Sequence, residues 1–339
     1  MSSPFPAGSW EYLFATPYSP SASITVDRLQ PGEAPVVAYL TFNSCHKLLE
    51  QAGDAHQEDS TVLALVARAD GRPIGLALAE KIGLRDGENP TGKESLLLRS
   101  VFINLLWQNK GVGKLLLAFL ETAARDAGYI AIRTEYGPKL DSFEAFERLL
   151  ASQGWSNPVP FMEESLFRIA DMVDAAWLKR VPELQEGDEL VMFDTLTESE
   201  HADIHERLRT GDIPQGLSPF AEGEHLVPEL SVGLRHEGRI VAWMSLVRSY
   251  GIKDALCYRS LYVDPTLRMA NGLGPIVAAE AFRRHAESAI AIDRPKGVFN
   301  THHTAVKQMN FVRKRLLPCC FETYAFRSSE LDLQQPSSA

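Results

Sequence analysis

The sequence predicts an α/β fold that occurs twice, in tandem. Three observations support this prediction. Strand-like and helix-like stretches alternate along the 339-residue chain. A short glycine turn stands between a strand and a helix in each half, and the same order of elements occurs twice. That order is hairpin, strand, G-x-G turn, helix, strand, helix and strand. A chain of this length suffices for two ordinary domains.

The first copy begins with a hairpin and a buried strand. Residues 60–82 contain two β-rich runs around Asp70-Gly71, a dipeptide typical of tight hairpin turns. Residues 94–107 form one long apolar run, as expected of a strand whose two faces are both covered. These two features predict the strands that lead into the first glycine turn.

A helix, a strand, a second helix and a closing strand complete the first copy. Gly128 stands where a helix C-terminal cap is expected, after a run in which apolar residues recur with helical spacing. Residues 129–136 are predicted to form a strand, residues 142–155 a helix and residues 160–172 the closing strand. The apolar positions of the first helix are Val112, Leu115, Leu116, Phe119, Leu120 and Ala123.

The second copy repeats this order. Residues 231–249 predict a hairpin around Glu237-Gly238, and residues 255–263 predict an apolar strand. Gly272 and Gly274 then precede a helix, and a strand, a helix and a strand follow. The expected domains are residues 1–174 and 190–330, joined by a linker at 175–189, and residues 331–339 are expected to be a disordered tail.

Composition narrows the classes of function. The formal net charge is −10 and the isoelectric point is about 5.5, which argues against a nucleic-acid-binding protein because such proteins need a basic face. The four cysteines show no spacing that suits zinc, so no metal is expected. No signal peptide or membrane span is evident, and we expect a cytoplasmic protein without a membrane partner.

The turn at residues 108–113 does not fit two common nucleotide-binding loops. A Walker A loop would need a hydroxyl residue after Lys114 to bind magnesium, and Leu115 stands there. A dinucleotide-binding fingerprint would need a third glycine, where the chain has Leu116. With these two loops excluded, the remaining interpretation is a Q-x-x-G-x-G turn before a helix. Its backbone N–H groups and the helix dipole can hold a pyrophosphate without metal.

With these residues in view, the chain resembles two tandem copies of the GNAT acyl-CoA N-acyltransferase superfamily. The resemblance covers residues 24–172 and 190–327. It implies a mixed sheet in which the fourth and fifth strands separate to admit the pantetheine arm of acetyl-CoA or another short acyl-CoA. The backbone of Phe102 and Ile103 would line the acyl arm. The pyrophosphate would lie on the turn formed by Gln108, Asn109, Lys110, Gly111, Val112 and Gly113, with Lys114 beside it.

The second copy departs from the family's pattern. Three residues, Met269 to Asn271, separate Arg268 from Gly272, where the family signature has two. Either this copy binds a coenzyme with an altered loop, or it is a degenerate copy kept for its sheet. The layout is similar to that of mycothiol synthases, in which the second copy carries out the chemistry.

Acyl transfer to an amine needs a base for the amine and an acid for the leaving thiolate. Glu135 and Tyr136 end the predicted fifth strand of the first copy and are the candidate catalytic residues. The family often supplies the acid from a tyrosine in the last helix. At that place this chain has Leu150 in the first copy and Val306 in the second.

The sequence thus favours an N-acetyltransferase that moves an acetyl or short acyl group from acyl-CoA directly to the primary amine of a small molecule. Two alternatives stay open. One is a catalytically silent acyl-CoA-binding sensor or scaffold protein, which the missing tyrosines suggest. The other is an acyl-CoA enzyme of the same fold that does not acylate nitrogen.

Overall fold

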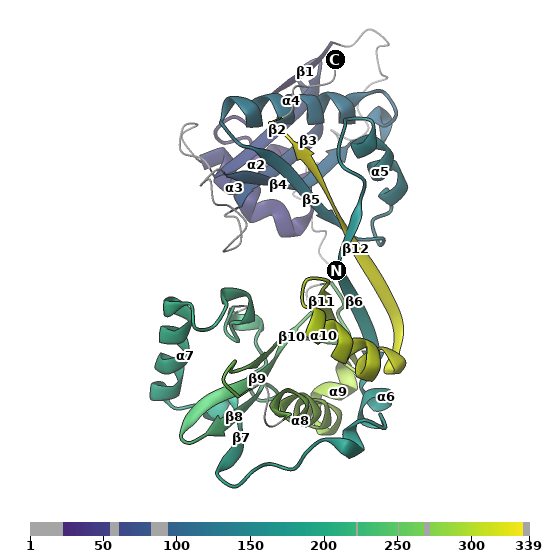
Figure 1. Ribbon diagram of the computed structural model, residues 1–339. Helices are drawn as coiled ribbons and strands as arrows, with labels where there is room; N and C mark the ends of the chain where they lie inside the picture. Colours follow the sequence, from purple (N-terminus) through teal and green to yellow (C-terminus); the bar gives the residue numbers. More distant parts are fainter. Residues whose placement is uncertain are drawn as a thin grey trace. The chain divides into compact units, whose positions relative to one another are not determined.

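A computed structural model describes residues 23–54, 61–82, 94–221, 223–249, 251–267 and 272–334. The chain divides into two compact units, which Figure 1 shows as ribbons. Unit 1 contains Met1–Val159 and Ser328–Ala339, and unit 2 contains Pro160–Arg327. Each unit is described separately below.

Unit 1 is a sheet with helices on both faces. Its strands follow the order β1-β2-β3-β4-β5-β12, and only the last residues of β12 belong to this unit. The β4–β5 pair is parallel, whereas β1–β2, β2–β3 and β3–β4 are antiparallel, so the sheet is mixed as expected. The elements are β1 (Ile24–Arg28), α2 (Ala34–Val37), α3 (His46–Asp54), β2 (Val62–Ala69), β3 (Arg72–Ile82), β4 (Ser95–Ile103), α4 (Val112–Asp126), β5 (Ala131–Tyr136) and α5 (Phe143–Ala151).

The two faces of unit 1 carry separate cores because side chains alternate along a strand. On β2, Leu63 and Leu65 pack into the core beneath α4, whereas Ala64 and Val66 pack into the core beneath α2 and α3. A strand that is apolar at every position therefore fills both layers at once. This double burial is the physical reason that the strands read as continuous apolar runs.

Unit 2 repeats the layered arrangement. Its strand order is β12-β6-β11-β10-β9-β8-β7, with β10 and β11 parallel. One core lies beneath α8 and α6, and another lies on the α7 side. The elements are β6 (Val159–Arg168), α6 (Ile169–Val173), β7 (Asp188–Met192), α7 (Glu198–Thr210), β8 (Val232–His236), β9 (Arg239–Arg248), β10 (Ala255–Val263), α8 (Leu273–Glu287), α9 (Ile290–Asp293), β11 (Lys296–His302), α10 (Val306–Phe311), the π-helical turn η8 (Val312–Leu316) and β12 (Cys320–Asp332).

The two copies match in detail. Both predicted hairpins have turns in which the two central residues adopt positive φ, at Asp70-Gly71 and at Glu237-Gly238. The pairing of β3 with β4 shifts register at Arg99, and the pairing of β9 with β10 shifts at Arg259. Each shift is a β-bulge at the Arg of an Arg-Ser pair. The internal duplication therefore extends to single residues.

The closing strands depart from a simple tandem order. The strand that ends the first copy, β6, lies in unit 2 and pairs antiparallel with β11. The last residues of β12, which ends the second copy, lie in unit 1, where Glu330 and Ser156 exchange backbone and side-chain hydrogen bonds. Each unit is therefore completed by a strand from the other copy. The expected domain limits follow the order of elements and stay a prediction.

Two of the expected segments, the tail and the linker, lie at least partly within the described residues. The tail expected from residue 331 is ordered as far as residue 334. Leu331 and Leu333 are only 8% and 5% exposed, because the end of the strand places both on the core side of unit 1. The linker expected at 175–189 packs on unit 2 through Ala175 and Trp177, which are both buried. Residues 335–339 lie outside the described part of the chain.

Candidate functional site

The first feature of the site is an opening between two strands of unit 1. The parallel ladder of β4 and β5 runs from Ser95↔Ala131 to Leu98↔Thr134, and both strands continue beyond it. The bulge at Arg99 follows the last paired position of β4 and bends that strand. The ends of β4 and β5, which include Phe102 and Tyr136, therefore face each other across a gap in the hydrogen-bond ladder.

The chain between β4 and α4 is held by local hydrogen bonds. Asn104 Oδ1 accepts from the backbone N–H of Leu106 at 3.0 Å, which starts a short 3₁₀ turn. The Gln108 side-chain amide donates to the carbonyl oxygen of Ile103 at 3.2 Å. Lys110 Nζ lies 5.1 Å from the centre of the Trp107 ring. Gln108 thus ties the turn back to the end of β4, at the position where the first residue of the motif was expected.

The turn adopts left-handed backbone conformation twice. Asn109 has φ 60° and Gly111 has φ 82°, a region that asparagine tolerates and glycine favours. Gly111 is the N-cap of α4, whose first N–H groups have no acceptor within the helix. A Cβ built on Gly111 would meet no atom within 4 Å, so the space beside Gly111 at this helix N-terminus is open.

The second glycine has a different role. A Cβ on Gly113 would lie 3.0 Å from Leu149 Cδ2 and 3.4 Å from Ile103 Cδ1. A side chain at this position would push α4 away from α5 and from the end of β4. Gly111 is therefore required for the backbone conformation of the turn, and Gly113 is required for close packing behind it.

The turn is electropositive although the whole protein is acidic. Lys110 and Lys114 are exposed on either side of Gly111 and Gly113, and the α4 dipole places partial positive charge at the same end. Exposed backbone N–H groups, a helix N-terminus and two ammonium groups together suit a diphosphate. The gap between β4 and β5 could hold an arm attached to that diphosphate. Within the described residues, no group of three potential metal ligands occurs, and no helix could span a membrane.

Sequence comparison identifies a family for this part of the chain. The profile of the acetyltransferase (GNAT) family matches residues 33–150, which include the opening and the glycine turn. A comparison with curated protein sequences finds no match.

Solved structures resemble nearly the whole chain. A tandem GNAT protein from the clavulanic acid biosynthesis pathway is 14% identical, with a TM-score of 0.60 over 93% of this chain and 100% of that one. A glucosamine N-acetyltransferase region of a fungal multi-domain β-N-acetylglucosaminidase is 13% identical, with a TM-score of 0.58 over 91% of this chain and 38% of that one. A probable N-acyltransferase from Enterococcus faecalis V583 is 7% identical, with a TM-score of 0.56 over 92% and 73%.

Residues 33–150 thus match the GNAT acetyltransferase family, and nearly the whole chain has the fold of tandem GNAT proteins. The duplicated fold and the GNAT resemblance predicted from the sequence are supported by these similarities.

The candidate catalytic residues lie at the end of β5 in the first copy. Glu135 is exposed, and Tyr136 is only 7% exposed. The Tyr136 hydroxyl donates to Glu147 Oε1 on α5 at 3.2 Å. The Tyr136 ring packs edge-on against Phe146, with 5.1 Å between ring centres. The structure thus brings Tyr136 to a carboxylate that the sequence reasoning missed.

A sequence signal for Glu147 exists. Along α5, Phe143, Phe146 and Leu150 form the apolar face, and Glu147 occurs on the same face at helical spacing. A carboxylate on an apolar stripe needs a buried partner, so its presence could have indicated a site. Leu150, at the position where relatives often have a tyrosine, is 1% exposed and belongs to the core.

In the second copy the glycine at the start of α8 is covered. Gly272 is the N-cap of α8 and has φ 61°, as Gly111 does at the start of α4. A Cβ on Gly272 would lie 3.1 Å from Pro182 Cγ, whereas the same construction on Gly111 meets open space. Arg268 to Asn271, where the altered motif was noted, lie outside the described residues.

Proposed function

We propose that the first GNAT copy transfers an acetyl or short acyl group from acyl-CoA directly to the primary amine of a small molecule. The observation that carries this proposal is the open, electropositive turn at Gly111, located at the end of the gap between β4 and β5. This chain resembles a tandem GNAT protein whose structure is described as being without AcCoA. The coenzyme named for that protein is the one proposed for this chain.

The coenzyme-binding residues we assign are Gln108 to Lys114 for the diphosphate, and the backbone of Phe102 and Ile103 for the acyl arm. Phe102 is 38% exposed at the end of β4, so its strand edge is accessible. A backbone N–H at this strand edge could stabilise the negative charge that forms on the thioester oxygen. Asn109 and Gly111 set the direction of the N–H groups before any ligand binds, which lowers the cost of ordering them.

Glu135 and Tyr136 are the proposed acid–base pair. Glu135 accepts the proton of the ammonium form of the acceptor, directly or through a water, which leaves the amine lone pair free to attack. The Tyr136 hydroxyl gives a proton to the departing thiolate, and Glu147, to which this hydroxyl donates in the structure, fixes its orientation until then. The proton that the new amide nitrogen loses restores the Tyr136 hydroxyl, and Glu135 releases the ammonium proton to solvent, which returns the pair to its starting state.

The test is an assay of thiol release with a panel of small primary amines, with the product identified by mass. We expect Tyr136→Phe and Glu147→Gln to lower kcat by about 10²-fold or more, the scale of general acid–base catalysis. Glu144→Gln is the matched control, because Glu144 lies on the exposed face of α5 and its side chain is 86% exposed. Equal rates for Glu147→Gln and Glu144→Gln would contradict the assignment.

A second candidate function is acyl-CoA binding without turnover. It is favoured by Leu150, a buried core residue where relatives often have the tyrosine. Calorimetry separates the two functions: coenzyme binding that depends on Gly111, together with no thiol release with any amine, would support the sensor. A product whose new bond is not an amide would instead indicate a non-N-acylating enzyme.

A further inference from the structure

The sheet of unit 1 has two strands that its first helices do not cover. The core beneath α2 and α3 takes residues from β2 and β3, and it contains no described residue of β4 or β5. On the other side of the sheet, the core beneath α4 contains residues of β4 and β5 as well. We call the α2–α3 side of β4 and β5, which carries Arg133 and Glu135, the open face.

The alternation of side chains along β5 places Arg133 and Glu135 on the open face. Ile132 and Tyr136 belong to the core beneath α4, so the side chains of Arg133 and Glu135 point to the opposite side. Arg133 pairs with Leu97 in the parallel ladder, whereas Glu135 lies beyond the last paired position, where the gap begins. Their Cα atoms are two residues apart along a strand, about 6.6 Å.

Arg133 keeps hydrogen-bond donors for a ligand. Its side chain is 33% exposed, and its ion pair with Glu330 is long, at 3.5 Å from Nε to Oε2. Its guanidinium makes no hydrogen bond to any part of the chain that the structure describes. A guanidinium has five N–H donors, and its planar geometry fits a carboxylate. By contrast, Arg99 at the bulge of β4 already donates to Glu80.

Glu135 supplies the opposite charge on the same face. It is exposed, and its side chain has no ion pair or hydrogen bond with the described residues. Glu135 and Tyr136 are successive residues of a strand, so the proposed base and the proposed acid point to opposite sides of β5. The amine therefore reaches the thioester from the open face, next to Arg133.

An apolar side chain lies at the end of β4 on this face. Phe102 pairs with Leu76, which belongs to the core beneath α2 and α3, so the Phe102 ring points to the same side. The ring is 38% exposed and offers contact area to an apolar group. A molecule with a carboxylate, an amine and an apolar body matches the cation, the anion and the ring of the open face.

We infer that the acceptor of unit 1 is an amino acid with an apolar side chain, which Arg133 holds by its carboxylate and Glu135 by its amine. This inference rests on the proposed acyl transfer and names the class of amine. The acyl carbon–sulfur bond breaks as the carbon–nitrogen bond forms, Glu135 takes the ammonium proton, and the thiolate takes a proton from Tyr136. The amide product is neutral at nitrogen, so it loses the attraction to Glu135.

The test compares amino acids with amines that lack only the carboxylate. L-Phenylalanine is paired with phenethylamine, and L-leucine with 3-methylbutylamine, in an assay of thiol release from acetyl-CoA. We expect the amino acid of each pair to have the higher kcat/KM. Arg133→Gln should raise the KM for the amino acids roughly ten-fold or more, the scale of a charge-assisted hydrogen bond, and reduce their advantage over the amines by a similar factor.

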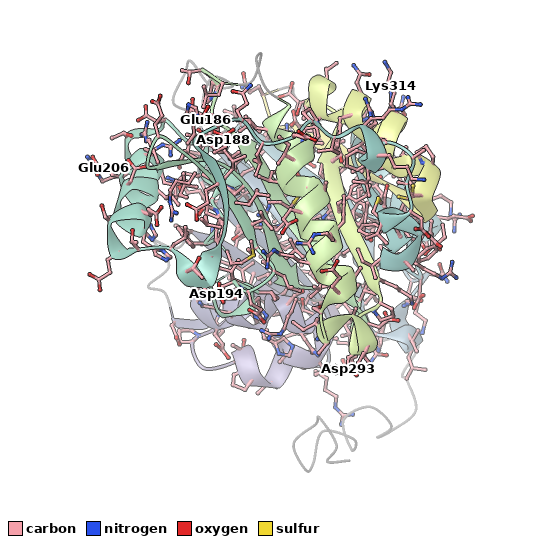
Figure 2. All side chains as sticks on the ribbon, turned by 90° about the horizontal axis from the view of Figure 1, so that it is seen from below. Glu186, Asp188, Asp194, Glu206, Asp293 and Lys314 are labelled. Atoms are coloured by element: carbon pink, nitrogen blue, oxygen red, sulfur yellow. The ribbon has the colours of Figure 1, made fainter. Side chains whose placement is uncertain are left out.

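Three further variants sharpen the test. Glu330→Gln removes the carboxylate beside Arg133 and should lower the KM for the amino acids; it decides the inference if Arg133→Gln does not fold. Arg148→Gln is the matched control in unit 1, because its side chain is 72% exposed on α5. Lys314→Gln removes one positive charge from an exposed residue of unit 2, which Figure 2 shows pointing outward. Both controls should leave the kinetics unchanged.

The outcomes separate this inference from the proposed function. Acylation of the amines with a higher kcat/KM than the amino acids would overturn the inference and leave the acyl transfer standing. An equal effect of Arg133→Gln on both members of a pair would also overturn it, because a merely structural role of Arg133 affects both alike. Acylation of other amines but of neither pair would overturn it too. Thiol release with no amine at all would overturn both proposals.

Discussion

Gly111 and Gly272 occupy the same place in two copies of one fold, yet only one of them faces open space. Both are N-caps of 15-residue helices and both have positive φ. Pro182 covers Gly272, and no atom lies within 4 Å of the Cβ position of Gly111. The comparison teaches that a glycine turn defines a possible anion site, and that a residue remote from the motif decides whether the site is usable.

The largest expected effect concerns the end of the closing strand β12, which packs into the core of unit 1 and not of unit 2. Leu331→Ala with Leu333→Ala should lower the free energy of unfolding of unit 1 by about 4 kcal/mol or more, because each substitution leaves a cavity in its core. Scanning calorimetry should show the transition of unit 1 falling and that of unit 2 retained. Leu184→Ala, at a residue 40% exposed, is the control. A combined loss below about 1 kcal/mol would show that residues 328–334 do not complete unit 1.

A charge placed at the first turn gives the next largest effect. Gly111→Asp keeps a residue that tolerates positive φ but places a carboxylate in front of the α4 N-terminus. Repulsion of a diphosphate at about 5 Å is worth about 3 kcal/mol at an effective dielectric constant of 20, so acetyl-CoA affinity should fall roughly 100-fold. Calorimetric titration checks this.

Gly128→Asp is the matched control for that measurement. Gly128 also has φ 82° and open space, but it lies at the other end of the same helix. Its substitution carries the same backbone strain and should leave the affinity unchanged. A similar loss in both variants would assign the effect to strain, and would remove the case for a diphosphate at Gly111.

Acid should affect unit 2 before unit 1. Burial lowers the pKa of His285 below its ordinary value of 6.5, so the folded state keeps this imidazole neutral. The stability it contributes is present above about pH 6.5 and is lost as the pH falls toward the lowered pKa. The equivalent residue on α4 is Ala124, which does not titrate.

Thermal unfolding between pH 7 and pH 5 measures this difference. The transition of unit 2 should fall over that range, and His285→Gln should make it less dependent on pH. Carboxylates whose pKa is lowered, such as Glu200 and Glu280, respond only below about pH 4.5. A unit 1 transition that falls equally over the same range would contradict the role of His285.

The smallest expected effect concerns Pro182 itself. Gly111→Ala and Gly272→Ala should each cost about 1 kcal/mol, because alanine is strained at positive φ. Gly272→Ala also crowds Pro182. A double-mutant cycle with Pro182→Ala should therefore show a coupling of about 0.5 kcal/mol with Gly272→Ala and none with Gly111→Ala. Additive effects at both positions would mean that Pro182 does not cover the second turn.

The sequence by itself determined the duplicated fold and the position of the first turn. Those features are local: Asp70-Gly71 specifies a hairpin by its own conformational preference, and the spacing of apolar residues specifies α4. Gln108, Gly111 and Gly113 are adjacent along the chain, so their pattern could be read without knowledge of any distant contact. The profile match to residues 33–150 agrees with that reading.

Only the tertiary structure decided which strand completes which unit, and which residues face each site. The partners of β6 and β12 lie more than 100 residues away in sequence. The alternation of apolar residues in a strand does not specify which of several strand edges it pairs with. Tyr136 meets Glu147, and Pro182 meets Gly272, through contacts that no periodicity encodes. Local conformational preference determines where helices and strands form. The contacts between them depend on how distant parts of the chain pack together, because the interior is close-packed and each side chain's neighbours come from several elements.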